Sequence, residues 1–570
     1  MSLPKCIYTL RLSHHFSTAT KTASAVRLPK LSNVPTRYKS ETIKQAQQAL
    51  TDYLHATRSL SFPSAEHISK NCLFSLTNLI KKIEFSVPKF SNRFKRLLRY
   101  HPINEFEFFF ESIGIDYNQV CDFLPPNKYF FSEDGTLLNV ATELSRFGFP
   151  WNMLGKLYEE EISIFSESSE VLKARLSRLK ECGFSNHSVV GMCLAFPYLL
   201  AVEGEPGGDA ALFDDFKRVL VEFDMEYCVE GNVDAWYDVC KKVRVFCDLG
   251  CGKGKIGELM GRKKDVFLTC PAEVLCQKSR YFCRFGVRKE DVGLFLLQSP
   301  EVLNFDLETP NISALGLLEI FGLNVKEIEA VIEKYPHVMG KNKMANLPHV
   351  IRALDLHEWF FTKIKNEPQL LENYVISDFD EDIAKEFGEG LERIQSTTTP
   401  IHTMRKLDFM HSIGFGENTL TLKVLAHLHG RSGELQKRFD SLFSTGIDFS
   451  RLCLMISTTP KILNQNPESL EAKVNFLCEE MKSSLEYLNI FPAFLCFDLE
   501  NRVKPRYRFY VWLKEKGLHS ESYSIATMIA TSEKQFVARA FGIHPAAPKH
   551  WFERFSYRRS FKNCAGTSIP

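Results

Sequence analysis

The sequence lacks the features of a membrane-spanning protein and of a zinc-binding module. Its 570 residues contain no run of 18 or more apolar side chains, which a helix needs to cross a bilayer. The 16 cysteines include no Cys-x-x-Cys pair, and those between residues 247 and 283 have no closely spaced histidine partners. We therefore expect no metal site, no cofactor, and thiols that serve as small buried apolar groups.

Arrangements typical of catalysis are also missing. We find no pair of carboxylates at a spacing that indicates acid and base chemistry, no Ser, His and Asp order of a hydrolase, and no His-Glu-x-x-His helix. His427 and His429 lie in a degenerate repeat, at the place where proline is expected, and a structural role explains them better than metal binding. The sequence predicts a protein that is not an enzyme.

Acidic residues are absent from the first 40 positions, which contain seven lysines and arginines among many serines and threonines. This composition is typical of a transit peptide, and the segment Arg11–Phe16 favours import into mitochondria over import into chloroplasts. Without these seven charges the formal net charge falls from +2 to −5. A nucleic-acid site would therefore have to be a local basic surface.

What the sequence does contain is a repeated pair of residues. A glycine is followed 14 positions later by a proline at Gly183 and Pro197, Gly286 and Pro300, Gly322 and Pro336, and Gly446 and Pro460. Apolar residues stand four before and one after each glycine, and two apolar residues follow each proline at the second and third positions. The unit predicts a helix, a glycine turn, a second helix and a proline that ends it.

Weaker copies of the unit surround the four clear ones. They centre on Gly114, Gly148, Gly250, Gly414, on Leu354 with Pro368, and on Cys478 with Pro492, and neighbouring copies are 32 to 36 residues apart. A helical unit at this period buries its apolar face against its neighbours. The predicted fold is all-α, a solenoid or superhelix of helical repeats with a curved groove.

One glycine-rich segment has a sequence pattern that also occurs in a catalytic motif. Val245–Met260 is similar to the first motif of S-adenosylmethionine-dependent methyltransferases, in which glycines let the backbone approach the cofactor. The second strand with its acidic residue, which such enzymes need about 20 residues later, is missing. The repeat accounts for the same residues, with Phe246 four before and Ile256 six after Gly250. We interpret the segment as another repeat.

The glycines, the prolines with their apolar pairs and the closing segment Phe491–Tyr510 together resemble the mitochondrial transcription termination factor (mTERF) family, in its plant organellar form. The resemblance extends over roughly Phe110 to Tyr510. It implies a superhelix whose concave basic face holds double-stranded nucleic acid, and a role in organellar gene expression. Several weaker copies lack the proline, and residues 372–395 are acidic, which leaves the length of the contact with nucleic acid open.

These observations divide the chain into four parts. We expect a mitochondrial transit peptide in residues 1–40, a helical extension in 41–100, the mTERF-like array in 101–510 and a basic segment in 511–570. The most basic region is residues 501–570, which comprise the end of the array and the basic segment. It contains 13 lysines and arginines and 4 acidic residues.

Two dense groups of basic residues are candidates for phosphate contacts. The predicted nucleic-acid-binding residues are Lys241, Lys242, Lys253, Lys255, Arg262, Lys263, Lys264, Arg502, Lys504, Arg506, Arg508 and Lys514. Tyr507, Tyr510 and Trp512 could add a surface that stacks on unpaired bases. If this group binds nucleic acid, charge reversal at Arg502, Lys504 and Arg506 should weaken binding to all sequences alike.

The function favoured by the sequence is that of a monomeric protein of the mitochondrial matrix that binds double-stranded DNA and regulates transcription termination or transcript level. An RNA-binding factor for intron splicing or transcript processing is one alternative, and a chloroplast location remains open. A scaffold that binds proteins of the organellar transcription or processing machinery along its groove is another, because solenoids commonly bind proteins.

Overall fold

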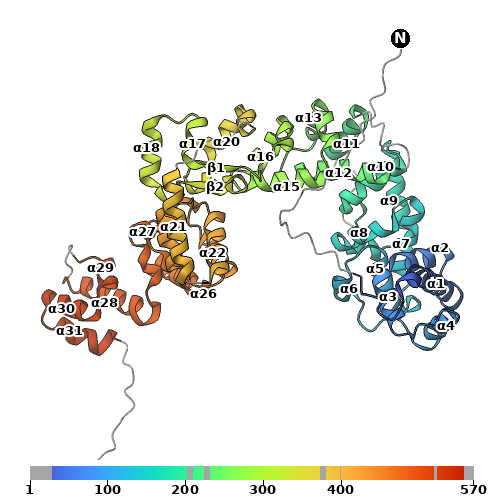
Figure 1. The fold of residues 1–570 in the computed structure, drawn as a ribbon, viewed down its shortest axis with the longest axis horizontal. Helices are drawn as coiled ribbons and strands as arrows, with labels where there is room; N and C mark the ends of the chain where they lie inside the picture. Colours follow the sequence, from blue (N-terminus) through green and yellow to red (C-terminus); the bar gives the residue numbers. More distant parts are fainter. Residues whose placement is uncertain are drawn as a thin grey trace, which may run out of the picture. The chain divides into compact units, whose positions relative to one another are not determined.

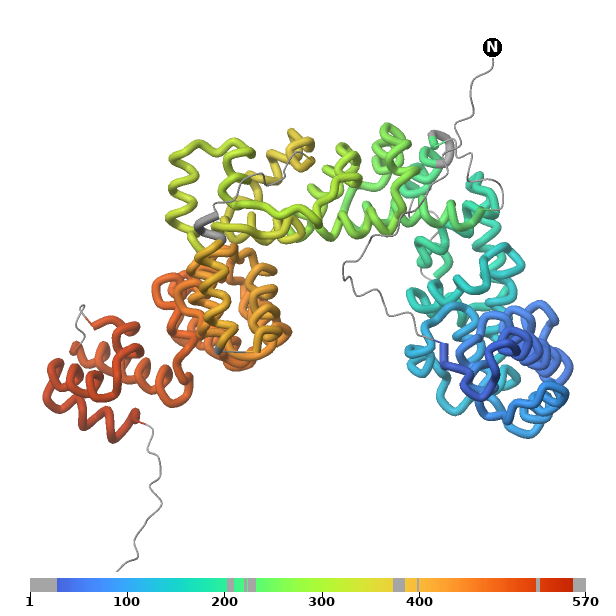
Figure 2. Tube along the Cα trace, in the orientation of Figure 1, coloured from blue at the N-terminus to red at the C-terminus, as the bar shows by residue number. Residues whose placement is uncertain are grey.

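The computed structural model of the chain describes residues 28–201, 210–223, 232–372, 381–397, 399–518 and 523–556 (Figure 2, coloured tube). Within these ranges the chain forms 31 α-helices and only two strands of three residues each, which confirms the predicted all-α class (Figure 1). None of the helices in the described ranges is both long and apolar enough to cross a membrane.

Two compact units divide the chain, and the division falls within helix α12 (Val233–Asp248). Unit 1 consists of Met1–Arg244 with Lys253–Gly261, and unit 2 of Val245–Gly252 with Arg262–Pro570. Besides the first part of α12, the helices of unit 1 are α1 (Lys39–Asp52), α2 (Phe62–Asn71), α3 (Leu73–Lys81), α4 (Phe90–Tyr100), α5 (Glu105–Ser112), α6 (Tyr117–Phe123), α7 (Thr136–Phe147), α8 (Leu154–Glu160), α9 (Ser169–Glu181), α10 (Asn186–Ala195), α11 (Ala210–Glu222) and α13 (Ile256–Arg262). In the view of Figure 1, α1 to α6 gather at one end of this unit and α10 and α11 at the other.

Unit 2 continues the helical array to the C-terminal helices. Its helices are α14 (Lys264–Thr269), α15 (Ala272–Cys283), α16 (Lys289–Gln298), α17 (Ala314–Ile320), α18 (Val325–Lys334), α19 (Leu347–Ala353), α20 (His357–Asn366), α21 (Glu381–Thr397), α22 (Pro400–Ser412), α23 (Thr419–His427), α24 (Ser432–Ser444), α25 (Phe449–Thr458), α26 (Pro467–Asn475), α27 (Tyr487–Ile490), α28 (Lys504–Glu515), α29 (Ile525–Ala530), α30 (Glu533–Ile543) and α31 (Ala547–His550). The strands β1 (Asn311–Ser313) and β2 (Lys341–Lys343) pair antiparallel, with Ile312 opposite Asn342.

The predicted repeat unit is present in the structure at all four clear copies. Each glycine follows a first helix and has a positive φ between 81° and 95°, which a residue without a side chain adopts at little cost. Three residues later a second helix of ten residues begins, and these helices are α10, α16, α18 and α25. Each proline then opens a short 3₁₀-helix that contains the apolar pair or its first member.

Proline explains why the second helix ends at the same point in every copy. Its ring disfavours the α conformation of the residue before it. In six copies that preceding residue has a φ between −135° and −127° and a ψ between 52° and 74°. The residues concerned are Phe196, Ser299, Tyr335, Glu367, Thr459 and Phe491. The same backbone conformation at the residue before proline therefore recurs in both units.

Two weaker copies differ from the predicted alignment. The residue with the positive φ is Asp355, with a φ of 58°, and not the neighbouring Leu354. In the last copy it is Lys482, with a φ of 54°, whereas Cys478 lies inside a short π-helical turn, Phe476–Glu480. The sequence alignment failed at these positions because neither copy has a glycine to mark the turn.

The C-terminal helices form a core of their own within unit 2. Phe509 and Leu513 of α28 pack with Met528, Phe536 and Trp551 of the helices that follow, and all five side chains are buried. In Figure 1, α28 to α31 lie together as one group of helices. The basic segment predicted from residue 511 onward is therefore folded as far as residue 555.

Candidate nucleic-acid interface

The first predicted group of basic residues is divided between the two units. In unit 1, Lys253 and Lys255 lie exposed in the turn after Gly250, and Lys241 is half-buried with its Nζ 5.9 Å from the centre of the Tyr237 ring. The Nζ of Lys253 lies 6.0 Å from the centre of the Tyr198 ring. Both lysines of this turn are exposed to solvent.

Lys242, in contrast, is 1% exposed and its Nζ lies 2.6 Å from the Asp238 carboxylate. An ammonium group buried in this way and paired with a carboxylate cannot reach a phosphate without breaking its local structure. We therefore leave Lys242 out of the interface that we propose below.

The unit 2 part of this group lies at the start of α14. Arg262 and Lys263 are exposed and Lys264 is half-buried. The Nζ of Lys263 forms an ion pair with Glu301, and both side chains are about half exposed. Such an exposed pair contributes little to stability, so the lysine can exchange its carboxylate for a phosphate at small cost.

The second predicted group contains two arginines that bind the protein's own backbone. Arg506 is 2% exposed and donates to the carbonyl oxygens of Met528, Ile529 and Thr531 at 2.7, 3.2 and 2.7 Å, and to Glu533 at 2.7 Å. Arg502, one helical turn earlier, donates to the carbonyl oxygens of residues 529, 530 and 531 at 2.8, 3.0 and 2.7 Å. Burial and the neighbouring charge of Arg506 lower the pKa of Arg502.

These contacts have a clear structural purpose. The last carbonyl groups of a helix have no partner within the helix, and a cation near the C-terminus interacts favourably with the helix dipole. Arg502 and Arg506 satisfy these groups at the end of α29. The sequence analysis assigned these positive charges to phosphate contacts, whereas in the structure they hold the end of α29. Arg506, like Lys242, is therefore not part of the interface that we propose.

The other members of this group are accessible to different degrees. Arg508 and Lys514 are exposed on α28, whereas Lys504 is half-buried and paired with Glu500. The three predicted aromatic residues are half-buried; Tyr507 donates to the carbonyl oxygen of Glu480, and Trp512 packs against the ring of Phe509. These contacts favour a structural role for Tyr507 and Trp512 over base stacking.

A recurring basic position was missed by the sequence analysis. A lysine or arginine eight residues before the glycine donates to a carbonyl oxygen near the end of the same repeat. The pairs are Arg175 with Leu200, Lys278 with Phe305, Lys406 with Leu428, and Arg438 with Leu463. Lys242 also stands eight residues before a glycine, Gly250. This spacing would have distinguished Lys242, as a structural lysine, from the lysines on the surface.

The glycine-rich segment has the geometry of a repeat turn. The residues expected to form a strand in a methyltransferase belong to α12, and Gly250 follows this helix with a φ of 86°. The backbone nitrogens of Gly254 and Gly257 donate to the buried Asp215 carboxylate at 2.6 and 2.8 Å. These two backbone donors of the segment are therefore already paired within the protein.

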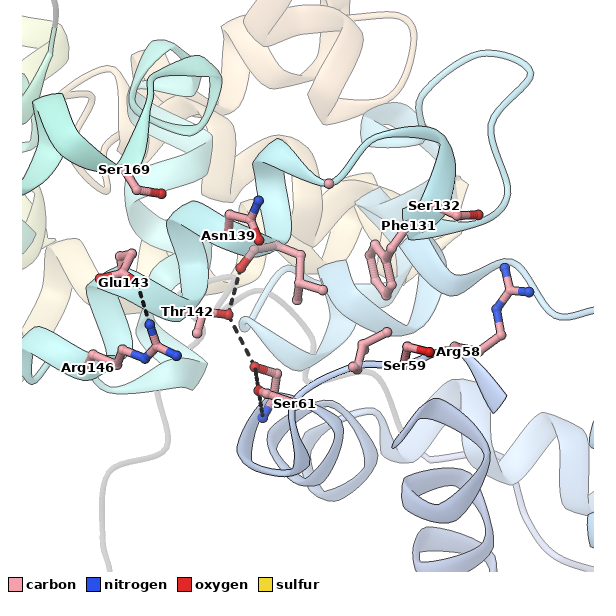
Figure 3. Close-up of a pocket in the computed structure, with 14 residues that line it drawn as sticks. Arg58, Ser59, Ser61, Phe131, Ser132, Asn139, Thr142, Glu143, Arg146 and Ser169 are labelled. Atoms are coloured by element: carbon pink, nitrogen blue, oxygen red, sulfur yellow. Dashed lines mark hydrogen bonds and ion pairs between the residues drawn. The ribbon is translucent and has the colours of Figure 1, made fainter. Parts of the chain in front are cut away.

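A polar pocket of about 370 Å³ lies in unit 1 between α2 and α7 (Figure 3). Its hydroxyl groups bond to one another, as between Ser64 and Thr142 at 3.2 Å, and its Arg146 is paired with Glu143. Within the described ranges no three histidine, cysteine, aspartate or glutamate side chains lie close enough to hold a metal ion. The pocket has no pair of groups suited to acid and base catalysis.

Fold and surface together define a helical-repeat protein with exposed basic residues in the turns between its helices. A model of the mTERF family matches residues 236–356 and 398–537. The chain is 53% identical over 551 residues to the mitochondrial transcription termination factor MTEF18 of Arabidopsis thaliana, an alignment that covers 96% of this chain and 97% of that relative. The chain belongs to the mTERF family.

More distant relatives cover only parts of the chain. It is 25% identical over 257 residues to the chloroplastic transcription termination factor MTERF8 of Arabidopsis thaliana, covering 44% of this chain and 45% of the relative. It is 30% identical over 110 residues to the chloroplastic transcription termination factor MTERF4 of Oryza sativa subsp. japonica, covering 19% and 20%. The family is not one of enzymes, which confirms the prediction that this protein is not an enzyme.

Proposed function

We propose that this protein binds double-stranded DNA in the mitochondrial matrix and regulates mitochondrial gene expression, through transcription termination or transcript level. The observation that supports this most is that six of the twelve predicted basic residues are exposed and lie inside the segments that match the family. These six residues are Lys253, Lys255, Arg262, Lys263, Arg508 and Lys514.

Exposed lysines and arginines in turns and on helix surfaces suit the sugar–phosphate backbone of a duplex. Each contact with a phosphate releases a condensed cation, so affinity depends steeply on salt and little on sequence. We propose that Lys253 and Lys255 form one group of phosphate contacts and that Arg508 and Lys514 form another. Half-buried Lys241, Lys264 and Lys504 would add to the positive charge beside these groups, whereas Arg502, which is bonded to the end of α29, would not.

The binding test uses the full chain and a fluorescent duplex DNA at several salt concentrations. We expect the double variants Lys253→Glu with Lys255→Glu, and Arg508→Glu with Lys514→Glu, each to weaken binding by about tenfold and to reduce the salt slope by about two. Fluorescence anisotropy measures both quantities.

The matched control is Arg178→Glu with Lys180→Glu, which reverses two exposed charges on α9 outside the matched segments. This control should bind within about twofold of the wild type. Unchanged binding by both test variants would refute the proposed interface. Tighter binding of an RNA of the same sequence would replace the DNA target by RNA, and retention of neither nucleic acid would favour the protein scaffold.

Import into mitochondria is proposed from the basic N-terminus and from the mitochondrial location in the name of the 53% identical relative. The structure bears on where a transit peptide would end. Leu31 and Val34 are buried, and the Asn33 side chain donates to the carbonyl oxygens of Ile80 and Ile83 at 3.2 and 3.0 Å. Removal of residues 1–40 would also delete the start of α1.

We therefore expect the imported protein to begin before Leu31. Mass spectrometry of the N-terminal peptide from protein purified out of mitochondria determines this position directly. A mature N-terminus after Asn33 would contradict the expectation, because the contacts of Asn33 with the end of α3 would then be absent from the working protein.

A further inference from the structure

The helix α4 and the turn before it form a strongly basic segment outside the two segments that the family model matches. Residues 81–101 contain seven lysines and arginines and one acidic residue, Glu84. The basic residues are Lys81, Lys82, Lys89, Arg93, Lys95, Arg96 and Arg99. All seven are exposed. In the view of Figure 1, α4 lies at the end of unit 1 opposite α10 and α11.

The apolar side of α4 is already used for packing. Phe90, Phe94 and Leu98 follow at intervals of four residues and are 2%, 0% and 2% exposed. Helix α4 packs here against α1. The basic side faces away from this contact, because Lys89, Arg93, Arg96 and Tyr100 follow at intervals of four, three and four along the same helix. Lys89, Arg93 and Arg96 therefore form one basic stripe along α4, with Tyr100 at its end.

A groove of about 410 Å³ runs beside this stripe. It is lined by the end of α3 and by α4, including Lys82, Arg93, Arg96, Tyr100 and His101. The one acidic residue of the lining, Glu84, lies 3.4 Å from Arg93. Apart from this pair and Lys95 with Asp52, none of the seven basic residues has an ion-pair partner among the residues that the structure describes. The groove thus holds an excess of positive charge.

An aromatic ring completes the groove. Tyr100 is 68% exposed, and the Arg96 guanidinium lies 5.9 Å from the centre of its ring. An exposed flat ring among cations is suited to stack on an unpaired base while the cations hold the adjoining phosphates. We propose that this groove, lined by Lys82, Arg93, Arg96 and Tyr100, binds a single-stranded nucleic acid.

Two other anionic partners fit the groove less well. A duplex keeps its bases stacked inside, so it would leave the Tyr100 ring without a base to contact. A membrane-binding helix inserts its apolar side into the lipid, whereas the apolar side of α4 is buried against α1. The single strand is the partner that uses both the charge and the exposed ring.

The test measures binding of the full chain to a fluorescent oligouridine of about 16 nucleotides and, separately, to a duplex DNA. The triple variant Lys82→Glu, Arg93→Glu and Arg96→Glu should bind the oligouridine at least about tenfold more weakly, since three charges that line the groove are reversed. Its affinity for the duplex should change by less than about twofold, because the proposed duplex contacts lie elsewhere. If the wild type did not bind the duplex, the proposed function would be refuted, but the inference about this groove would be unaffected.

Matched controls separate a specific site from general charge. Arg178→Glu, Lys180→Glu and Lys217→Glu reverse three exposed charges elsewhere in unit 1 and should leave oligouridine binding within about twofold of the wild type. Tyr100→Ala should weaken binding about fivefold and Tyr100→Trp should preserve it, whereas Tyr129→Ala, at a tyrosine that is 57% exposed in the same unit, should have no effect.

Three results would overturn the inference. One is wild-type affinity of the triple variant for oligouridine, and another is an equal loss in the control triple variant. The third is binding of the wild type to anionic lipid vesicles or to an acidic protein, lost in the triple variant, with no binding of oligouridine.

Discussion

Replacement of Arg506 by methionine is expected to lower the free energy of unfolding of the C-terminal helices by about 3 kcal/mol. The guanidinium is buried and donates to three carbonyl oxygens at the end of α29 and to Glu533. Methionine keeps much of the volume but leaves these acceptors without their donor. Hydrogen exchange of α28 to α31 and thermal unfolding measure the loss.

The neighbouring Arg508→Met is the matched control, because Arg508 is exposed on the same helix. It should change stability by less than about 0.5 kcal/mol. If Arg506→Met left the exchange rates of α29 unchanged, its contacts would not stabilise the fold. This pair also matters for binding studies: charge reversal at Arg506 would weaken nucleic-acid binding by unfolding α29, whether or not the residue touches a phosphate.

Acidification from pH 7.5 to pH 5 is expected to destabilise unit 2 through buried histidines. His337 is fully buried beside the ring of Phe415, and neither of its ring nitrogens has a hydrogen-bond partner within the described residues. Burial lowers the pKa of His337 to about 4, and it also lowers the pKa values of His349 and His411 to about 4. In an unfolded chain a histidine has a pKa of about 6.5.

The sign of the effect follows from these pKa values. Between pH 6.5 and pH 4 the unfolded chain binds a proton at each histidine that the folded chain does not, so stability is complete above pH 6.5 and falls as the pH falls. At pH 5 His337 alone should cost about 2 kcal/mol. Urea unfolding at several pH values measures this dependence.

In His337→Leu, one proton fewer should be taken up on unfolding at low pH, so the free energy of unfolding should fall less steeply with falling pH. At pH 7.5 this free energy should be equal to that of the wild type or higher by up to about 1 kcal/mol, because an unpartnered polar ring no longer has to be buried. The control His429→Leu changes an exposed histidine and should alter the free energy of unfolding at pH 7.5 by less than about 0.5 kcal/mol. An identical pH profile in His337→Leu and the wild type would show that His337 does not titrate in this range.

The repeat could be predicted from sequence because glycine and proline mark its two turns directly. Gly183, Gly286, Gly322 and Gly446 stand where a positive φ is needed, and the paired prolines stand where the second helix ends. Where another residue takes the positive φ, as at Asp355 and Lys482, the turn leaves no mark in the sequence. Both side chains are exposed, and neither aspartate nor lysine is confined to the left-handed region, so the residue type does not identify the turn.

The candidate interface was harder to predict, because the sequence does not show whether a lysine or arginine lies on the surface or in the core. Lys242 and Arg506 lie among exposed basic residues in the sequence, yet each is buried with acceptors of its own. The stripe on α4 was missed for the opposite reason: its residues lie outside the repeats. Only the packing of Phe94 against α1 shows which side of that helix remains open.

The second helix of the repeat also indicates how such a chain can change its length over evolution. It contains ten residues in α10, α16, α18, α20 and α25, although α20 begins only two residues after its positive-φ residue instead of three. A residue lost from the turn leaves the helix intact, whereas one lost inside the helix would rotate every later apolar side chain by about 100°. We therefore expect this array to tolerate the loss of a residue in a turn better than inside a second helix, and the duplication of a whole repeat to preserve the pattern of buried faces.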